Sequence, residues 1–320
     1  MDGSPAAPAG STTPVAAHSG PIVAVIGPTA TGKSDLGVRI AAELGGQIVN
    51  ADASQFYRGM DVGTAKLSQQ QRGGIAHHQI DVLDIADEAR VAAYQQSARI
   101  DVAAIRSMGD RPVVVGGSGL YLRALLDQLD IPPTDPRVRA RYENALAERG
   151  ADALHAELTA RDPVAASRLD ARNQRRVVRA LEVIELTGKP FSASMPRREF
   201  VEPAVMIGLS ADRPVLNARI RARIDGMWLS GFLEEVKALD ANGLRDSPTA
   251  RRALGYSQAL AHLDGRLDAE QARGDTAIAT RKYARRQMAW FRPDPRITWL
   301  PHDAPDLLAV ALKAVESSSA

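Results

Sequence analysis

Residues 27–34 read G-P-T-A-T-G-K-S, and this stretch decides the fold. It matches the pattern G-x-x-x-x-G-K-[S/T] in full. The apolar run PIVAVI at residues 21–26 precedes it and is typical of a strand buried on both faces of a parallel sheet. A helical pattern follows it, with apolar side chains at Leu36, Ile40 and Leu44. A strand, a glycine-rich loop and a helix in this order predict a phosphate-binding P-loop.

The P-loop predicts both a fold class and a ligand. Together with a second apolar run at residues 47–51, it indicates an α/β fold with a P-loop NTPase-like parallel sheet. Lys33 would contact phosphate oxygens, and Ser34 would ligate Mg²⁺ as a cofactor. The alternative is a chance glycine-rich turn, but the position between a strand and a helix argues against it. The residues expected to bind a diphosphate or triphosphate group are Gly27, Pro28, Thr29, Ala30, Thr31, Gly32, Lys33 and Ser34.

Composition excludes several classes of protein. The chain has 320 residues, of which 45% are hydrophobic and 24% charged, as in an ordinary globular protein. The absence of cysteine excludes a disulfide framework, a cysteine-ligated zinc finger and a thiol nucleophile. The net charge of +2, from 40 Lys plus Arg and 38 Asp plus Glu, does not by itself indicate a nucleic-acid-binding protein. No apolar run approaches the ~20 residues of a membrane span, so we expect no membrane partner.

A change of composition divides the chain into two predicted parts. The segment IPPTDP at residues 131–136 reads as a connector, and residues 136–187 are rich in Ala, Arg and Glu and read only as helices. The apolar run AVMIGL at residues 204–209 then returns to a strand pattern. We therefore expect an α/β core, a helical insertion and a disordered N-terminal tail. The predicted ranges are residues 21–126 and 204–312 for the core, 127–203 for the insertion and 1–20 for the tail.

Two polar side chains beyond the P-loop are candidates for the chemistry. A P-loop NTPase usually has a strand that ends in an acid, but the apolar run at residues 112–115 ends in Gly-Gly-Ser-Gly. Asp52 follows the second strand, at the edge of the sheet where ligands bind, and could act as a general base. The alternative role for Asp52 is to cap its loop. Ser118 could donate a hydrogen bond to a phosphate oxygen or serve as a helix N-cap.

Basic residues gather in three groups in the second half of the chain. Tyr283, Trp290 and Phe291 are interleaved with the last group. Basic faces with nearby aromatic rings suit RNA or single-stranded nucleic acid, because unstacked bases stack on such rings. The alternative is that each group is a solvated helix face. The groups are Arg172, Arg175, Arg176 and Arg179; Arg219, Arg221 and Arg223; and Arg281, Lys282, Arg285, Arg286 and Arg292.

Eight blocks between residues 21 and 300 resemble the tRNA dimethylallyltransferase family. They are GPTATGKS (27–34), DASQFYRGMDVGTAK (52–66), HHQIDVLDI (77–85), VVVGGSGLYLRALL (113–126), NQRRVVRALEV (173–183), RIRAR (219–223), ALGYSQ (253–258) and ATRKYARRQMAWFR (279–292). The resemblance implies transfer of a dimethylallyl group from dimethylallyl diphosphate to the exocyclic amine of the adenosine immediately 3′ of the anticodon in tRNA. Diphosphate is the other product. We expect a monomer in the cytoplasm, with the helical insertion gripping the anticodon stem-loop.

The resemblance also implies roles for individual residues. Asp52 matches the acid that takes the amine proton, and Ser118 matches a position usually occupied by threonine. Arg219 matches the arginine that neutralises the leaving diphosphate, with Arg223 as a second cation. Ala53 departs from the serine that is usual in the family. The residues that match tRNA-contacting regions are Asp52, Ala53, Ser54, Gln55, Arg172, Arg175, Arg176, Arg252, Gly255, Tyr256, Arg281, Arg285 and Arg286.

Two other functions stay open on sequence grounds. The chain could be a P-loop enzyme for a small acceptor, either an adenylate isopentenyltransferase or a nucleotide-type kinase, although such an enzyme needs no basic helical insertion. It could instead be an RNA-binding protein that keeps a P-loop without turnover. If the P-loop holds a leaving diphosphate, ATP should bind weakly or only as a competitor.

Overall fold

A computed structural model describes residues 20–194 and 197–317 of the chain. All but the last residue of the predicted disordered tail, and the last three residues of the chain, lie outside the described residues. Two compact units are present. One contains the chain up to Glu88, Ser97–Gly117 and the chain from Pro203 onward, and the other contains Ala89–Gln96 and Ser118–Glu202. The predicted insertion at residues 127–203 stays a proposal about domain organisation.

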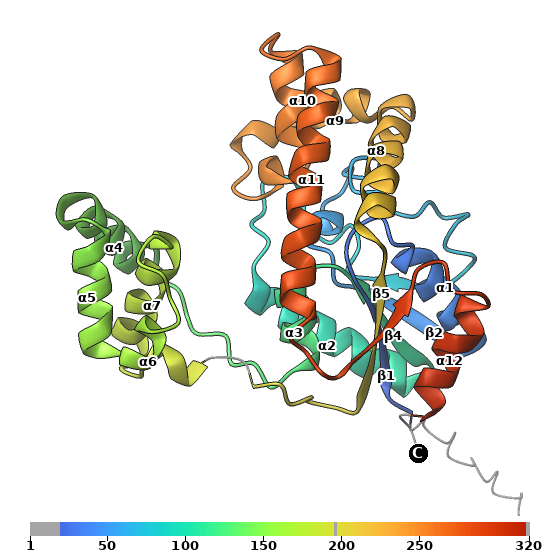
Figure 1. Ribbon diagram of the computed structural model, residues 1–320, viewed down its shortest axis with the longest axis horizontal. Helices are drawn as coiled ribbons and strands as arrows, with labels where there is room; N and C mark the ends of the chain where they lie inside the picture. The colour runs from blue at the N-terminus through green and yellow to red at the C-terminus, as the bar shows by residue number, and fades with distance from the viewer. Residues whose placement is uncertain (1–19, 195–196, 318–320) are drawn as a thin grey trace, which may run out of the picture. The chain divides into compact units, whose positions relative to one another are not determined.

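The first unit is built on a parallel sheet, as the P-loop predicts (Figure 1). Its strand order is β3-β2-β4-β1-β5-β6. The strands are β1 (Ile22–Ile26), β2 (Gly46–Asn50), β3 (His77–His78), β4 (Arg111–Gly116), β5 (Ala204–Ser210) and β6 (Ile297–Pro301). β1 pairs in parallel with β4 on one side and with β5 on the other. The loop that follows β1 is therefore flanked by the carboxyl ends of both neighbouring strands, which is where open α/β sheets bind ligands.

Helices surround this sheet and also make up most of the second unit. In the order of the chain, the helices are α1 (Lys33–Glu43), α2 (Val91–Ser107), α3 (Gly119–Leu126), α4 (Pro136–Arg149), α5 (Ala151–Arg161), α6 (Pro163–Ala166), α7 (Gln174–Thr187), α8 (Arg213–Leu229), α9 (Phe232–Ala241), α10 (Tyr256–Leu263), α11 (Ala269–Phe291) and α12 (Leu307–Ser317). Short 3₁₀ turns cover Ala53–Phe56, Phe191–Ser194, Leu244–Asp246 and Ala250–Arg252. None of the helices within the described ranges is both long and apolar enough to cross a membrane.

The core of the first unit lies between the sheet and its helices. Val25 of β1 and Ile207 of β5 are fully buried and belong to one cluster with Ile40 of α1 and Val315 of α12. The strand PIVAVI is thus buried on both faces, as its unbroken apolar run predicts. This packing fixes the position at which β1 ends and the P-loop begins.

The helices α4 to α7 enclose a separate core. Leu154, Leu158 and Leu181 are fully buried there. The carboxylate of Glu182 is buried beside them and accepts hydrogen bonds from Nη2 of Arg139 at 2.9 Å and Nη1 of Arg179 at 2.9 Å. Burial alone would raise the pKa of Glu182, but these hydrogen bonds outweigh it and lower the pKa. The unit therefore holds one of its arginine groups in place through a buried acid.

Local signals fix where two helices of the first unit begin. α11 begins at Ala269, because Asp268 and Gln271 form a capping box there. α10 begins at Tyr256 and is preceded by the 3₁₀ turn at Ala250–Arg252. α12 was not predicted, although its Ala311 and Val315 are buried against the sheet.

Candidate active site

The P-loop begins at Gly27, directly after β1, and only glycine fits at this position. Its φ of 137° lies in the left-handed region, and a Cβ there would lie 2.5 Å from the carbonyl oxygen of Leu209 in β5. Gly32 ends the loop with a φ of 90° directly before α1. The loop is thus held close to the sheet at one end and opens onto the N-terminus of α1 at the other, where backbone N–H groups favour an anion.

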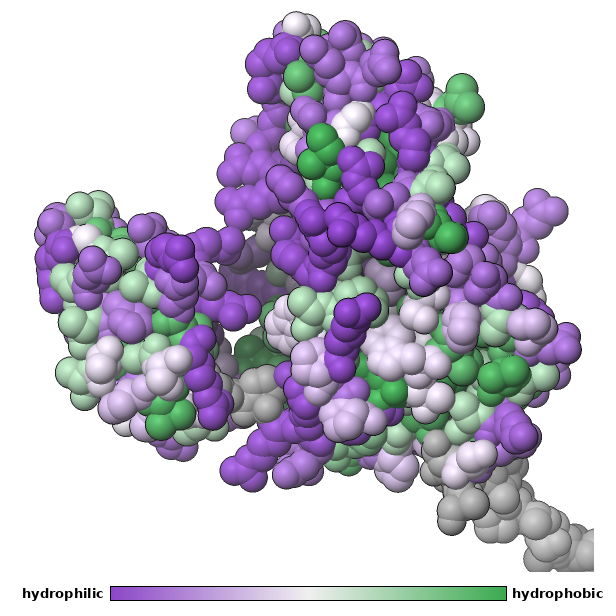
Figure 2. All heavy atoms as spheres, viewed as in Figure 1, coloured by the Kyte–Doolittle hydropathy of each residue, from purple (hydrophilic) through white to green (hydrophobic). Residues whose placement is uncertain are grey.

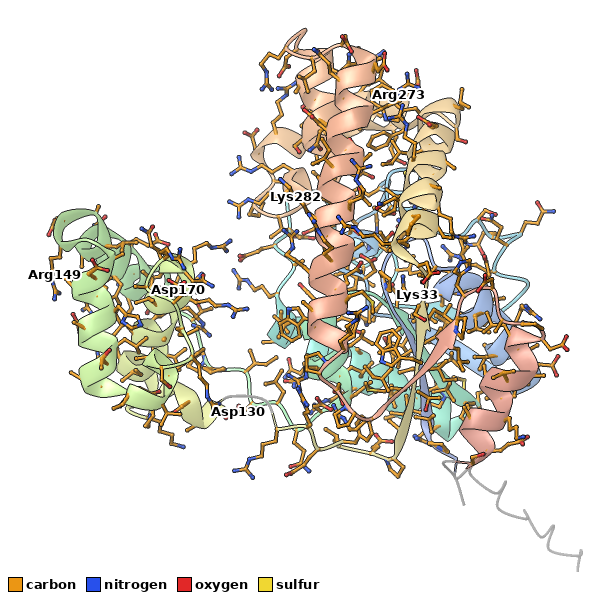
Figure 3. The ribbon with its side chains drawn as sticks, viewed as in Figure 1. Lys33, Asp130, Arg149, Asp170, Arg273 and Lys282 are labelled. Carbon is orange, nitrogen blue, oxygen red and sulfur yellow. The ribbon has the colours of Figure 1, made fainter. Side chains whose placement is uncertain are left out.

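Lys33 lies at the start of α1 with its amine inside the P-loop (Figure 3). Its Nζ donates a hydrogen bond to the carbonyl oxygen of Pro28 at 2.9 Å, and the hydroxyl of Thr31 donates to the same oxygen at 2.9 Å. Burial lowers the pKa of the Lys33 amine to about 8; the Asp52 carboxylate opposes this change and the Arg223 charge adds to it. Lys33 is partly buried and forms no ion pair with a described residue, so a phosphate group would give its amine a direct ionic partner.

Asp52 follows β2 and both caps a turn and faces the P-loop. Its Oδ1 accepts hydrogen bonds from the Ser54 hydroxyl at 2.7 Å and the Ser54 N–H at 3.2 Å, so the loop-capping role is realised. The N–H of Asp52 in turn donates to Asn50 at 3.0 Å. Oδ2 has no hydrogen-bond partner among the described residues. Its proximity to the Lys33 and Arg223 charges is evident from its effect on their pKa values. One carboxylate oxygen is therefore fixed and the other can accept a proton.

Two arginines of α8 are bonded to two loops of the site, one to the P-loop and one to the loop that contains Thr64. Nε of Arg219 donates to the carbonyl oxygen of Ala30 in the P-loop at 2.7 Å. Nη2 of Arg223 donates to the carbonyl oxygen of Thr64 at 3.2 Å. Residues four apart lie on the same side of a helix, so one face of α8 carries both cations. Burial lowers the pKa of Arg223, and Asp52 opposes this change. The structure thus gathers Lys33, Arg219 and Arg223 at the P-loop, as the predicted anion site requires.

Gln287 of α11 ties the P-loop to the end of β4, and sequence reasoning did not find it. Its Oε1 accepts a hydrogen bond from the N–H of Thr29 at 2.9 Å, and its Nε2 donates to the carbonyl oxygen of Gly117 at 2.9 Å. The side chain is almost fully buried. A Cβ on Gly117 would lie 2.1 Å from Nε2 of Gln287, so glycine is required there. The helix that carries the third basic group is therefore bonded directly to the phosphate cradle.

Glu235 of α9 holds the loop that supports Arg223, and it too was missed. Its carboxylate accepts hydrogen bonds from the N–H groups of Asp61 at 2.9 Å, Val62 at 2.6 Å and Gly63 at 3.1 Å. The Tyr256 hydroxyl donates to it at 2.7 Å. The carbonyl of the next residue in this loop, Thr64, is the acceptor for both Arg223 and Gln55. Glu235 thus fixes the position of two predicted site residues without touching the P-loop.

We expect Glu235→Gln to weaken binding of inorganic diphosphate at the P-loop by about 10-fold, because an amide replaces the carboxylate acceptor of three backbone N–H groups and hydrogen bonds to charged groups contribute about 1.5–3 kcal/mol. Arg223 would then lose the support of its loop. Calorimetric titration measures the affinity. The adjacent, exposed Glu234→Gln is the matched control, and equal affinities of the two variants would contradict this role.

The other predicted residues of the first unit, which match tRNA-contacting regions, differ in whether they are exposed. Ala53, Ser54 and Gln55 form the turn after Asp52, with Nε2 of Gln55 donating to Thr64 at 3.2 Å. Arg252 is exposed in a 3₁₀ turn. Gly255 and Tyr256 follow, but Tyr256 is fully buried and its hydroxyl points to Glu235, so it supports the loop and is not on the surface. Arg281, Arg285 and Arg286 lie along α11, whose surface is largely hydrophilic (Figure 2).

The remaining candidates belong to the second unit. Ser118 is the N-cap residue of α3, but its side chain makes no capping hydrogen bond. Arg172 forms an ion pair with Asp170 at 2.6 Å, and Arg175 and Arg176 are exposed in the first turn of α7. These three arginines thus share one short segment of the helical unit. Their predicted contact with nucleic acid stays a prediction.

Ser34 borders a small cavity of about 20 Å³ that is also lined by Asn50 and Gln55. This is enough space for one water molecule. Within the described part of the chain, no group of three or more histidine, aspartate or glutamate side chains could hold a metal ion. A cation at Ser34 would therefore need most of its ligands from water and from a bound phosphate, which is how Mg²⁺ commonly binds.

Comparison with known proteins identifies relatives across almost the whole chain. The family model described as IPP transferase matches residues 55–294. A protein from Kocuria rhizophila named tRNA dimethylallyltransferase is 56% identical over 299 residues, covering 92% of this chain and 95% of the relative. A protein of the same name from Streptomyces coelicolor is 51% identical over 298 residues, covering 92% and 96%.

Solved structures are similar as well. The tRNA isopentenylpyrophosphate transferase of Bacillus halodurans is 36% identical with a TM-score of 0.68, and the match covers 93% of this chain and 98% of that one. A eukaryotic dimethylallyltransferase acting on tRNA is 26% identical with a TM-score of 0.78, covering 90% of this chain and 75% of that one. The parallel sheet and its surrounding helices are thus shared with proteins of this kind.

Proposed function

Because the chain belongs to the IPP transferase family, we propose that it transfers a dimethylallyl group from dimethylallyl diphosphate to tRNA. The acceptor is the exocyclic amine of the adenosine immediately 3′ of the anticodon, and diphosphate is released. The observation that carries the proposal is the position of Asp52, which directly follows β2 at the ligand-binding edge of the sheet and is near enough to Lys33 and Arg223 to oppose the lowering of their pKa values. A proton acceptor beside a diphosphate cradle suits an alkyl transfer in which an amine replaces a diphosphate.

The P-loop holds the leaving group in this reaction. The bond between the allylic carbon and the diphosphate oxygen breaks, and negative charge grows on the diphosphate. Lys33, Arg219 and the N–H groups at the start of α1 are already in place to stabilise that charge. Ser118, through its hydroxyl, is proposed to bind the diphosphate from the turn after β4. The helix N-terminus and the cations thus act on the leaving group and need no nucleoside triphosphate, so ATP would bind as a competitor.

Asp52 takes the proton. The amine nitrogen forms a bond to the allylic carbon and then releases a proton, which Oδ2 of Asp52 accepts because it has no other partner in the described chain. The hydrogen bonds from Ser54 hold the carboxylate in a fixed orientation. Allylic carbon bears positive charge well, so the amine needs no strong activation before attack. Atoms balance with one N–C bond formed, one C–O bond broken and one proton moved to Asp52.

Mg²⁺ fits this site as a cofactor. Ser34 would hold it, with water and diphosphate oxygens as its other ligands, and the ion would supply positive charge that offsets the charge of the diphosphate. The proton acceptor and the arginines keep their roles whether or not the ion is bound.

The basic groups are proposed to bind tRNA. Arg281, Arg285 and Arg286 lie on α11, which is bonded to the P-loop through Gln287. Arg172, Arg175 and Arg176 lie at the start of α7 in the helical unit, which would grip the anticodon stem-loop. Extrusion of the target adenine is required, because its amine is otherwise stacked within the anticodon loop. We propose that one copy of the chain, acting in the cytoplasm, is sufficient.

Transfer from labelled dimethylallyl diphosphate tests the proposal. Label should appear on tRNA with adenosines at and around the target, and the labelled nucleoside should map to the position 3′ of the anticodon. AMP and ATP should accept no label under the same conditions. Label on AMP alone would assign a small-molecule enzyme, and tRNA binding without label would leave only an RNA-binding protein.

A further inference from the structure

A second hollow lies directly beside the P-loop and outside the site described above. It has a volume of about 510 Å³, in the range of small-ligand pockets. Pro28 of the P-loop forms part of its wall, together with the end of β5, the start of α8 and one face of α11. Lys33, Asp52, Arg219 and Arg223 do not line it. We call it the arginine pocket, after Arg213, Arg281, Arg285 and Arg292, which line it.

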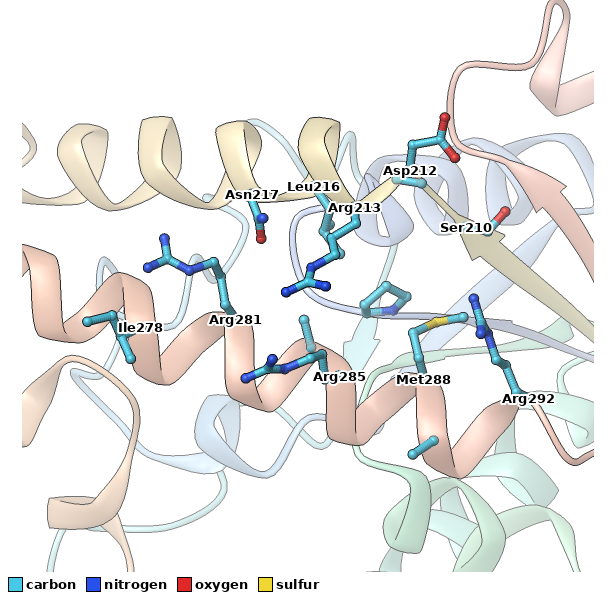
Figure 4. A pocket seen from close by; sticks show the side chains of 14 residues that line it. Ser210, Asp212, Arg213, Leu216, Asn217, Ile278, Arg281, Arg285, Met288 and Arg292 are labelled. Atoms are coloured by element: carbon cyan, nitrogen blue, oxygen red, sulfur yellow. The ribbon is translucent and has the colours of Figure 1, made fainter.

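The four arginines concentrate positive charge around one space. Arg213 extends from α8 and Arg281 extends from α11 into the gap between these helices, whereas Arg285 lies along α11 (Figure 4). None of the four has an ion pair or a side-chain hydrogen bond to any described residue, whereas Arg221 and Arg245 of the same unit pair with aspartates. Asp212 is the one acid among the described lining residues, and its carboxylate points away from the arginines (Figure 4). An anion in this space would supply the counter-charge that no described residue provides.

The start of α8 adds to this charge. Asp212 is the N-cap residue, but its side chain makes no capping hydrogen bond, and a cation, Arg213, occupies the first position of this 17-residue helix. A cation at a helix N-terminus opposes the helix dipole, whereas an anion there is stabilised by it. Arg213 is therefore placed where a bound anion would relieve two unfavourable interactions.

We propose that the arginine pocket is a second phosphate-binding site. Planar guanidinium groups bind phosphate oxygens in pairs, so four of them suit a ligand with at least two negative charges. Leu216, Ile278 and Met288 supply an apolar part of the wall that a carbon chain or flat ring attached to the phosphate can cover. The phosphate belongs either to a small molecule, such as the released diphosphate, or to the backbone of tRNA. The proposal rests in part on the proposed function, since Arg281 and Arg285 are also proposed to bind tRNA, but it uses no residue of the catalytic site.

Inorganic diphosphate is the probe for the small-molecule source. Calorimetric titration of the full chain should give two sites. Arg213→Ala and Arg292→Ala, the two lining arginines without an assigned role, should each weaken one site at least 10-fold and leave the other unchanged. Lys33→Ala should instead weaken binding at the P-loop and leave binding at the arginine pocket unchanged. Arg39→Ala is the matched control, because Arg39 is an exposed arginine of α1 that does not line the pocket. Thermal melting of each variant shows that the fold is retained.

Binding of tRNA is the test for the other source. If the phosphate is part of the nucleic acid, the chain binds one diphosphate, and Arg213→Ala and Arg292→Ala each weaken tRNA binding at least 5-fold and reduce the salt slope by about 1. Folded variants that match Arg39→Ala within 2-fold in both titrations would overturn the proposal. Neither titration requires turnover, so this result is separate from success or failure of the transfer assay.

Discussion

Asp52→Asn is expected to lower the rate of dimethylallyl transfer by about 10²- to 10⁴-fold, the usual contribution of a general base. The amide keeps the size of the carboxylate and its Oδ1 can still accept the hydrogen bonds from Ser54, which lie at 2.7 and 3.2 Å. It cannot accept the amine proton at the second position. Single-turnover assays with saturating tRNA measure the rate of this step. We expect the dissociation constant for tRNA to change by less than about 3-fold, because the turn that Asp52 caps is retained.

Ser54→Ala is the control for the capping role of Asp52. It removes the 2.7 Å hydrogen bond to Oδ1 but leaves the carboxylate and its charge. We expect a loss of no more than about 10-fold, because one hydrogen bond to a charged group contributes about 1.5–3 kcal/mol and the backbone bond from the same residue remains. If Asp52→Asn and Ser54→Ala reduce the rate equally, Asp52 acts only as a structural cap and the proton goes elsewhere.

The sequence predicted the parts of the site that depend on short segments. The P-loop, β1 and α1 lie within about 20 consecutive residues, so their pattern specifies the fold and the phosphate cradle together. Asp52 was found because it directly follows a strand of a parallel sheet, and such positions meet at one edge. Periodicity likewise located β4, β5 and the helices between residues 136 and 187.

Residues that act over long separations were not predictable in this way. Gln287 and Thr29 are 258 positions apart in the chain, and Glu235 and Gly63 are 172 apart. A glutamine or glutamate on a helix has no local signature that distinguishes a buried tether from a solvated side chain. The close-packed glycines near these tethers were the available signal, because a Cβ on Gly63 would meet Phe232 at 2.3 Å and the Tyr256 hydroxyl at 2.6 Å. Sequence alone shows a glycine there but not its neighbours.

The residues predicted to contact tRNA also show that sequence alone does not reveal the surroundings of a side chain. A match to a family block does not say which side of a helix a residue occupies. Tyr256 is fully buried and donates its hydroxyl proton to Glu235, whereas Arg252 of the same block is exposed. Burial raises the pKa of the Tyr256 hydroxyl, so it stays protonated and can keep donating. Tyr256 would therefore affect tRNA binding by supporting the loop at Gly63 and not by contacting the tRNA.

Diphosphate binding at the P-loop is expected to weaken about 10-fold between pH 7 and pH 9 in the wild type. The pKa of Lys33 is lowered to about 8, chiefly by burial, so the amine is mostly charged at pH 7 and mostly neutral at pH 9. A bound diphosphate favours the charged form, so binding must be tighter below the pKa than above it. Affinity is thus fully present below about pH 8 and is lost as the pH rises through that value. Calorimetry with inorganic diphosphate at several pH values measures the effect.

Two variants distinguish the titration of the Lys33 amine from the titration of diphosphate itself. Lys33→Met should bind diphosphate about 10- to 100-fold more weakly than the wild type at pH 7, because a charge-assisted contact of about 1.5–3 kcal/mol is lost. Near pH 9 the difference should shrink, since the wild-type amine is then largely neutral. Lys33→Arg keeps its charge throughout, so its affinity should follow only the protonation of the ligand. A wild-type profile that runs parallel to that of Lys33→Arg from pH 7 to 9 would show that Lys33 does not titrate at the phosphate cradle.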